Sequence, residues 1–191
     1  MDRNRFLKLS IAIGSLLSVP LKLRANTKKN ARADKGIFVA SGKDRFDKSL
    51  PIFDGDTFYC KVAGNDTHND LYVFESTRLK EGGPPLHFHY DQDEWWYVLE
   101  GEFMIKVGEA LYHAKRGDSV FGPRKVPHCF AKTGEGEARL LMIFQPAGRM
   151  EEYFKKTSEG YTSHMTEEER NQFMKDHGFE HVGPPLTYLK Q

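Results

Sequence analysis

The 191-residue chain lacks the features of a disulfide framework and of a nucleic-acid-binding protein. It contains only two cysteines, Cys60 and Cys129, which lie far apart in the sequence. We expect both to be buried free thiols in strands, because nothing in the sequence places them within bridging distance. The 28 basic and 27 acidic residues give a formal net charge of only +1. The sequence has no basic patch of the kind that would predict a nucleic-acid partner.

Long hydrophobic runs are also missing. The run from Leu9 to Leu21 is broken by a glycine and a proline and is too short to span a bilayer comfortably. Three basic residues precede it, which is typical of a signal peptide. We therefore predict a signal peptide over residues 1–25, export to the periplasm and a polar linker over residues 26–35. The alternative is an N-terminal helix of a cytoplasmic protein.

The rest of the chain is long enough for one substantial domain, which we place at residues 36–188. Its 39% apolar and 13% aromatic residues can form one core. Short apolar segments alternate with glycine-rich and charged turns, which predicts an all-β jelly-roll barrel, a double-stranded β-helix. The predicted strands span residues 36–40, 57–62, 71–77, 86–89, 94–100, 103–107, 110–113, 119–121, 128–132 and 139–145.

Near the C-terminus the hydrophobic period changes from that of strands to that of helices. Thr166 and Glu169 have the spacing of a capping box, and Phe173 and Met174 supply an apolar stripe. We predict a helical segment over residues 149–178 with one or two short helices, packed on the barrel.

Four side chains have the spacing of a metal site. His87 and His89 lie two residues apart, so both project from one face of a strand. Glu94 follows after enough residues for a tight turn, and a returning strand can bring its carboxylate beside both imidazoles. His128 completes the set from a distant segment.

Three imidazoles and one carboxylate suit a divalent transition metal, namely Fe, Ni, Mn, Co, Cu or Zn, but do not decide among them. Glu94 has two possible roles, as a metal ligand or as an unligated base, and the two can alternate. Each histidine alone could equally be an ordinary hydrogen-bonded strand residue. The remaining histidines lack partners at useful spacing and are expected at the surface: His68, His113, His164, His177 and His181.

The motifs around these residues resemble those of the cupin superfamily. The segment 83–89, Glu94 and Gly101 resemble the first cupin motif, and the segment 117–128 resembles the second. The chain departs from the second motif at Lys125, where the family usually has glycine, and at Lys132, where it usually has asparagine. Neither departure involves a predicted ligand.

Several phrases resemble the single-domain, quercetin-dioxygenase-like branch of that superfamily: residues 82–87, 97–102, 144–148 and 178–186. This resemblance implies a metal-dependent dioxygenase that acts with O2 on a phenolic, flavonol-like or enol substrate. His87, His89 and His128 would hold the metal, and Glu94 would take the substrate proton. The resemblance also suggests a homodimer.

Aromatic residues indicate an apolar substrate pocket. If Glu94 faces the barrel interior, the period of two places Trp96 there too, and places Trp95 and Tyr97 on the outer face, where a dimer partner could cover them. The predicted pocket residues, which could instead be simple core packing, are Trp96, Phe103, Ile105, Phe121, Phe130, Met142 and Phe144.

Two other functions fit the same residues. One is a non-catalytic, metal-stabilised protein that binds small molecules as a sensor or carrier. The other is a zinc-dependent hydrolase or isomerase without redox chemistry. No further acid–base pair in the sequence indicates this last chemistry.

Overall fold

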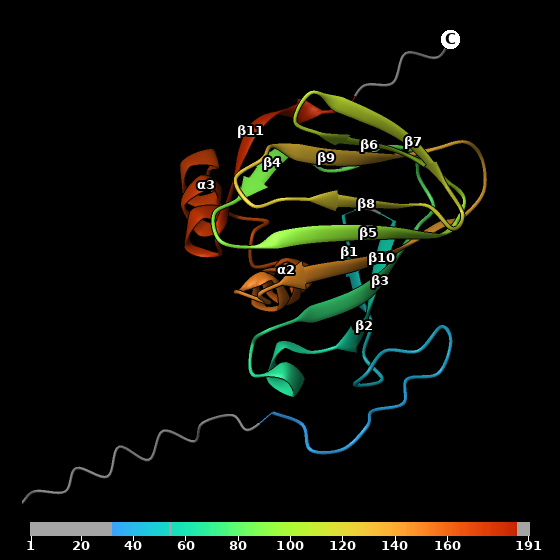
Figure 1. Cartoon of the computed structure of the whole chain (residues 1–191). Helices are drawn as coiled ribbons and strands as arrows, with labels where there is room; N and C mark the ends of the chain where they lie inside the picture. Colours follow the sequence, from blue (N-terminus) through green and yellow to red (C-terminus); the bar gives the residue numbers. More distant parts are fainter. Residues whose placement is uncertain (1–31, 54, 187–191) are drawn as a thin grey trace, which may run out of the picture.

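The computed structural model describes residues 32–53 and 55–186 (Figure 1). The predicted signal peptide at residues 1–25 lies outside the described residues, as does most of the linker predicted at residues 26–35. Among the described helices, none is both long enough and apolar enough to cross a membrane.

Two antiparallel sheets form the body of the protein (Figure 1). The larger contains, in spatial order, β1 (Leu50–Ile52), β2 (Asp56–Val62), β3 (Tyr72–Arg78), β10 (Ala138–Gln145), β5 (Asp93–Glu100) and β8 (Ser119–Gly122). The smaller contains β11 (Phe179–Pro185), β4 (Pro85–His89), β9 (His128–Thr133), β6 (Glu102–Val107) and β7 (Ala110–Lys115). This confirms the predicted all-β jelly roll.

The strand predictions fail at three places. Residues 36–40 are not a strand, and β1 and β11 were not predicted. The segment 36–40 is apolar, but strand formation also needs a neighbour to accept its backbone hydrogen bonds. β11 contains Gly183 and the pair Pro184 and Pro185, which weaken a strand pattern in the sequence. Its position at the edge of the smaller sheet tolerates them, because an edge strand needs partners on one side only.

The core lies between the sheets and follows the strand alternation. On β10, Leu140, Met142 and Phe144 point inward and are buried, whereas the residues between them are partly exposed. Their cross-strand partners on β5 include Trp96 and Val98, which are fully buried. Inward-facing side chains from both sheets therefore fill one continuous core.

Two helices cover one end of this core. They are α2 (Met150–Ser158) and α3 (Glu167–Asp176), and they lie close together in Figure 1. The predicted capping box is present: Glu169 N–H donates to Thr166 Oγ1, and Thr166 N–H donates to the Glu169 carboxylate. The rings of Tyr153 and Phe173 join the helices, 5.5 Å apart. A short 3-10 helix, η1 (Gly64–Thr67), connects β2 to β3.

Two further predictions concern the burial of the cysteines and of His177. Cys60 and Cys129 are buried free thiols, as predicted. His177, predicted at the surface, is instead buried, because it ends α3 between Tyr153 and Phe173. The helix turns it back towards the core, and its Nδ1 hydrogen-bonds to the Phe173 carbonyl at 2.6 Å.

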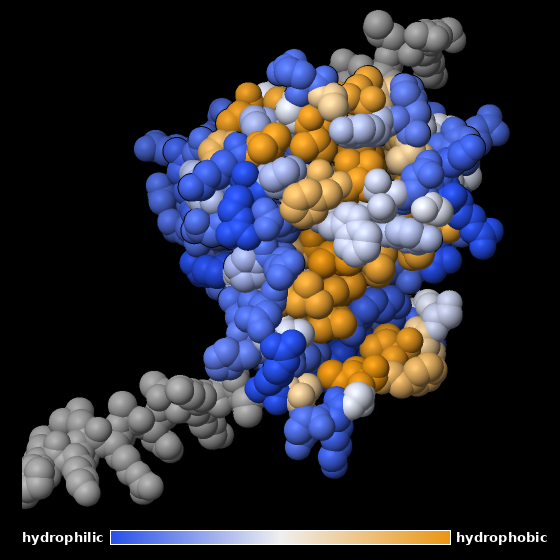
Figure 2. Space-filling model, in the orientation of Figure 1, coloured by the Kyte–Doolittle hydropathy of each residue, from blue (hydrophilic) through white to orange (hydrophobic). Residues whose placement is uncertain are grey.

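Hydrophobic residues also gather on the outside of the larger sheet. Figure 2 shows apolar surface over the middle of the face that carries β5, β8 and β10. Trp95, Tyr97 and Phe121 are exposed there, and Trp95 and Phe121 are cross-strand partners. The outward orientation of Trp95 and Tyr97 agrees with the predicted alternation of β5.

Candidate metal centre

Three strands from the two facing sheets bring the four predicted ligands together. His87 and His89 point into the barrel from β4, with Phe88 facing away between them. Glu94 lies near the start of β5, and His128 is the first residue of β9. His87 and His128 are cross-strand partners, so a chain separation of 41 residues becomes direct contact.

The loop before β9 is tied to the end of β4. Lys125 N–H donates to the His89 carbonyl at 2.8 Å. Lys125 has a φ of 64°, the left-handed conformation that glycine adopts most easily. This is the position where the cupin motif usually has glycine, so lysine occupies the same turn geometry at some conformational cost. The turn thereby delivers His128 beside His89.

The donor atoms converge on one point. Glu94 Oε2 lies 3.1 Å from His128 Nε2, 3.3 Å from His89 Nε2 and 3.9 Å from His87 Nε2. One ligand atom from each of the four residues lies within 4.8 Å of all the others. All four side chains are buried.

Hydrogen bonds determine which ring nitrogens face this point. His87 Nδ1 lies 2.8 Å from the Pro85 carbonyl, and His128 Nδ1 lies 2.9 Å from the Val126 carbonyl. A carbonyl can only accept, so both Nδ1 atoms carry hydrogen, and Nε2 is the ring nitrogen that faces Glu94. An ionised carboxylate this close to Nε2 requires a cation between the two atoms, either a proton on the ring or a metal ion. Histidines that bind a metal typically make such a hydrogen bond to a carbonyl through the ring nitrogen that does not bind the metal.

The pKa shifts describe a centre with neutral imidazole and ionised carboxylate. Burial lowers the pKa of His87 to about 3, with further lowering from His128 and His89. Burial alone would raise the pKa of Glu94, but contacts with His128 and His89 outweigh it and hold the value well below the usual range. Near neutral pH, His87 and Glu94 therefore have the protonation states that a metal requires.

The cluster fits a divalent metal. His89 Nδ1 and Nε2 are buried and hydrogen-bond to no described residue, which is costly for a polar atom unless something else binds it. At metal–ligand distances of about 2.1 Å, ligand atoms lie at most about 4.2 Å apart, so small side-chain movements bring the set into range. The donor set is that of transition metals rather than of calcium or magnesium.

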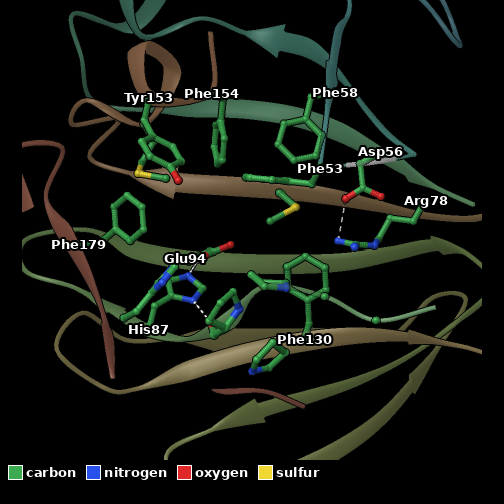
Figure 3. Close-up of a pocket in the computed structure, with 18 of the residues that line it drawn as sticks. Phe53, Asp56, Phe58, Arg78, His87, Glu94, Phe130, Tyr153, Phe154 and Phe179 are labelled. Atoms are coloured by element: carbon green, nitrogen blue, oxygen red, sulfur yellow. Dashed lines mark hydrogen bonds and ion pairs between the residues drawn. The ribbon is translucent and has the colours of Figure 1, made fainter. Parts of the chain in front are cut away.

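The cluster opens into a cavity of about 430 Å³, drawn in Figure 3. His87 and Glu94 belong to its lining. The wall also contains seven aromatic side chains: Phe53, Phe58, Phe130, Phe144, Tyr153, Phe154 and Phe179. Its volume and composition are typical of a site for a small, largely apolar molecule.

Three of the predicted pocket residues line this cavity: Phe130, Met142 and Phe144. Trp96, Phe103 and Ile105 are fully buried in the surrounding core instead and are not among the lining residues. They support the wall from behind; the rings of Phe103 and Phe130 are 6.2 Å apart.

The pocket prediction for Phe121 is wrong. Its side chain is 57% exposed on the outer face of β8. Phe121 pairs with Trp95, and cross-strand partners share one face of a sheet, so both residues point outward. The pairing register of β8, which the sequence does not show, decides this orientation.

Sequence reasoning missed several wall residues. Tyr153 and Phe154 come from α2, and Phe179 and His181 come from β11. His181 is exposed, as predicted, but it also lines the cavity, and its ring lies 6.2 Å from that of His87, its cross-strand partner. Phe179 and His181 are two residues apart, and this period of two was the available signal for an inward-facing pair.

Comparisons with known proteins agree with this architecture. Residues 76–144 match the family model described as the cupin domain. "Uncharacterized protein MJ1618" of Methanocaldococcus jannaschii is 26% identical over 110 residues, which cover 54% of this chain and 86% of that protein. "Protein SchB" of Streptomyces halstedii is 32% identical over 60 residues, or 31% of this chain; the match spans only 44% of SchB.

A solved structure supports the fold. KdgF from Halomonas sp. superposes with a TM-score of 0.51 at 17% identity, over 59% of this chain and 94% of KdgF. At this identity the likeness concerns the fold alone. The cupin domain matched at residues 76–144 and the jelly-roll fold agree with the resemblance of the sequence motifs to the cupin superfamily.

Proposed function

We propose that this protein is a metal-dependent dioxygenase that acts with O2 on a phenolic, flavonol-like or enol substrate. The observation that carries the proposal is the opening of a buried His3Glu cluster into an aromatic cavity. A cavity of this kind takes up a flat, apolar ring and excludes water around it. The resemblance of the sequence to the quercetin-dioxygenase-like branch agrees with this substrate class.

The residues of the centre divide the work. His87, His89 and His128 would hold the metal, and carbonyls orient two of the three rings. A bound transition metal supplies Lewis acidity towards the substrate oxygen and redox chemistry with O2. Glu94 is ionised and lines the cavity, so it can accept the proton of a substrate hydroxyl. Phe144 and Phe179 flank His89 and keep this end of the cavity apolar.

Oxygen uptake tests the proposal. Metal-loaded protein is screened against flavonols and simpler phenols in an oxygen electrode, beside Glu94→Gln and the control Glu102→Gln on the exposed face of β6. We expect metal-dependent uptake by the wild type and the control, and loss of uptake in Glu94→Gln with a modest decrease in metal content. Unchanged uptake in Glu94→Gln would refute the role of the base.

The same screen separates this function from that of a binding protein. A sensor or carrier is stabilised by a phenol without consuming oxygen, and thermal unfolding with each phenol measures that stabilisation directly. Stabilisation without uptake across the whole panel would replace the dioxygenase proposal with the binding function.

A further inference from the structure

The cavity has a second polar region apart from the metal cluster. Asp56 on β2 and Arg78 on β3 both line it and are both buried. Arg78 Nη1 lies 3.0 Å from Asp56 Oδ2, and the two residues are cross-strand partners. Figure 3 shows this pair on the opposite side of the pocket from His87 and Glu94.

The register of the larger sheet shows how far apart these two regions lie. Tyr72, Phe144 and Glu94 share one row across β3, β10 and β5. Arg78 lies six residues along β3 from Tyr72, so its row is about 20 Å from that of Glu94 at about 3.3 Å per residue. Side chains that reach into the cavity shorten this gap. The space between them suits an elongated molecule with a polar group at each end.

Both members of the buried pair line the cavity, and Arg78 is the more exposed of the two. Its side chain is 10% exposed, against 2% for that of Asp56. The guanidinium also lies 5.4 Å from the centre of the Phe130 ring, which forms part of the wall. Asp56 and Phe130 together hold Arg78 in a fixed orientation. A fixed guanidinium loses little entropy when it binds a planar acceptor group.

We propose that Arg78 binds a carboxylate of the substrate, at the side of the cavity remote from the metal cluster. This inference rests on the proposed function, because it takes the metal centre as the anchor for the other end of the substrate. It narrows the substrate class to elongated phenolic or enolic acids.

The charges around Arg78 are compatible with an anionic ligand. Burial raises the pKa of Asp56 to about 6, against the opposing effect of Arg78, so this competing carboxylate is ionised less readily than in water, although its ionised form still predominates at neutral pH. Lys80 and Glu81 also line the cavity, but they have opposite charges and are exposed, so solvent screens them. Among the described residues, Arg78 is therefore the buried cationic residue at this end of the cavity.

Catechols with a carboxylate on spacers of increasing length test the inference. Catechol, 3,4-dihydroxybenzoate, 3,4-dihydroxyphenylacetate and 3,4-dihydroxycinnamate are titrated calorimetrically into metal-loaded protein under nitrogen, each acid beside its methyl ester. We expect at least one acid to bind about tenfold or more tightly than its ester, since hydrogen bonds to a charged group are among the stronger ones. Equal affinities of acid and ester at every spacer length would overturn the inference.

A double variant locates the effect. Asp56→Asn with Arg78→Gln replaces the ion pair by neutral side chains of similar shape. We expect it to lose the preference for the acid while its affinity for the ester changes less than about threefold. The matched control is Glu75→Gln with Arg139→Gln, an ion pair between β3 and β10 that is not part of the cavity lining. A preference for the acid that survives in the cavity variant would also overturn the inference.

Cinnamate, which has no hydroxyl groups, separates this inference from the proposed function. If the catechols show no metal-dependent binding but cinnamate binds in a manner that requires Arg78, the carboxylate site stands and the metal-centred function fails. If catechol binds to the metal and no acid gains affinity over its ester, the metal-centred function stands and the carboxylate site fails. If none of these probes binds, both fail.

Discussion

Phe144 on β10 is the cross-strand partner of Glu94 on β5, and its ring lies 5.2 Å from the ring of His89. The wall of the cavity is therefore also the packing that supports the metal cluster. Phe144 is 1% exposed and contacts further aromatic rings, including those of Phe74 and Phe154. A change at this position should affect both the stability of the barrel and the geometry of the centre.

Phe144→Ala should destabilise the protein by about 3–5 kcal/mol, because it leaves a hole in a packed core. The matched variant Phe121→Ala removes the same side chain from an exposed position and should change the free energy of unfolding by less than about 0.5 kcal/mol. Urea denaturation of both variants measures the difference. Similar losses in the two variants would contradict the outward orientation of Phe121.

The contrast between these two phenylalanines shows what the sequence could predict. Phe144 was predicted as a pocket residue and lines the cavity, and the eight residues of β10 alternate regularly between buried and more exposed positions. β8 has only four residues, and its inner face follows from its pairing with β5. The motif residues His87, His89, Glu94 and His128 were identifiable because their spacing is specific. The cavity-wall residues on α2 and β11 were not identifiable from the sequence, because their positions depend on how distant segments pack.

Metal binding should stabilise the folded state. Its contribution is about 2.7 kcal/mol when the free metal concentration is one hundred times its dissociation constant. The double variant His87→Ala with His128→Ala should contain no metal, and chelator should no longer lower its melting temperature. Element analysis and thermal unfolding measure the two effects. The control, His113→Ala with His164→Ala, changes exposed histidines and should behave as the wild type does.

Stoichiometric metal in the variant that lacks His87 and His128 would place the metal elsewhere in the chain. Element analysis of the wild-type protein also identifies the metal. Fe, Ni, Mn, Co or Cu would favour oxygen chemistry, whereas zinc alone would favour the hydrolase, isomerase or binding functions.

Cys60 and Cys129 should react with a thiol reagent only after unfolding. Burial raises the pKa of Cys60 to about 12 and also raises that of Cys129, so the reactive thiolate is scarce in the folded protein. We expect no fast reaction in buffer and two equivalents in denaturant, without prior reduction. Two thiols that appear only after reduction would instead reveal a disulfide and contradict the packing of both residues.

Gly83→Ala should destabilise the protein by about 3 kcal/mol or more. A Cβ atom at Gly83 would lie 1.6 Å from the Phe130 carbonyl oxygen, and the backbone has to move to relieve this contact. Gly82 and Lys132 exchange two backbone hydrogen bonds next to this point, so the strain falls on the wall of the cavity. Gly36→Ala is the control, since nothing lies within 4 Å of a Cβ there. Denaturant midpoints that fall equally in both variants would contradict the close approach.

His177 should make the protein less stable in mild acid. Burial lowers its pKa from the ordinary value of 6.5; the Phe173 carbonyl and Glu152 oppose this shift, whereas Arg149 and Lys156 add to it. The unfolded chain therefore takes up a proton below about pH 6.5 that the folded state resists, and stability falls as the pH decreases through that value. His177→Leu removes the titrating group and should flatten the dependence of the melting temperature between pH 7.5 and pH 5. The exposed control His113→Leu should retain the wild-type slope. If the melting temperature of His177→Leu depended on pH as steeply as that of the wild type, His177 would titrate as it does in water. That result would contradict its buried position between Tyr153 and Phe173.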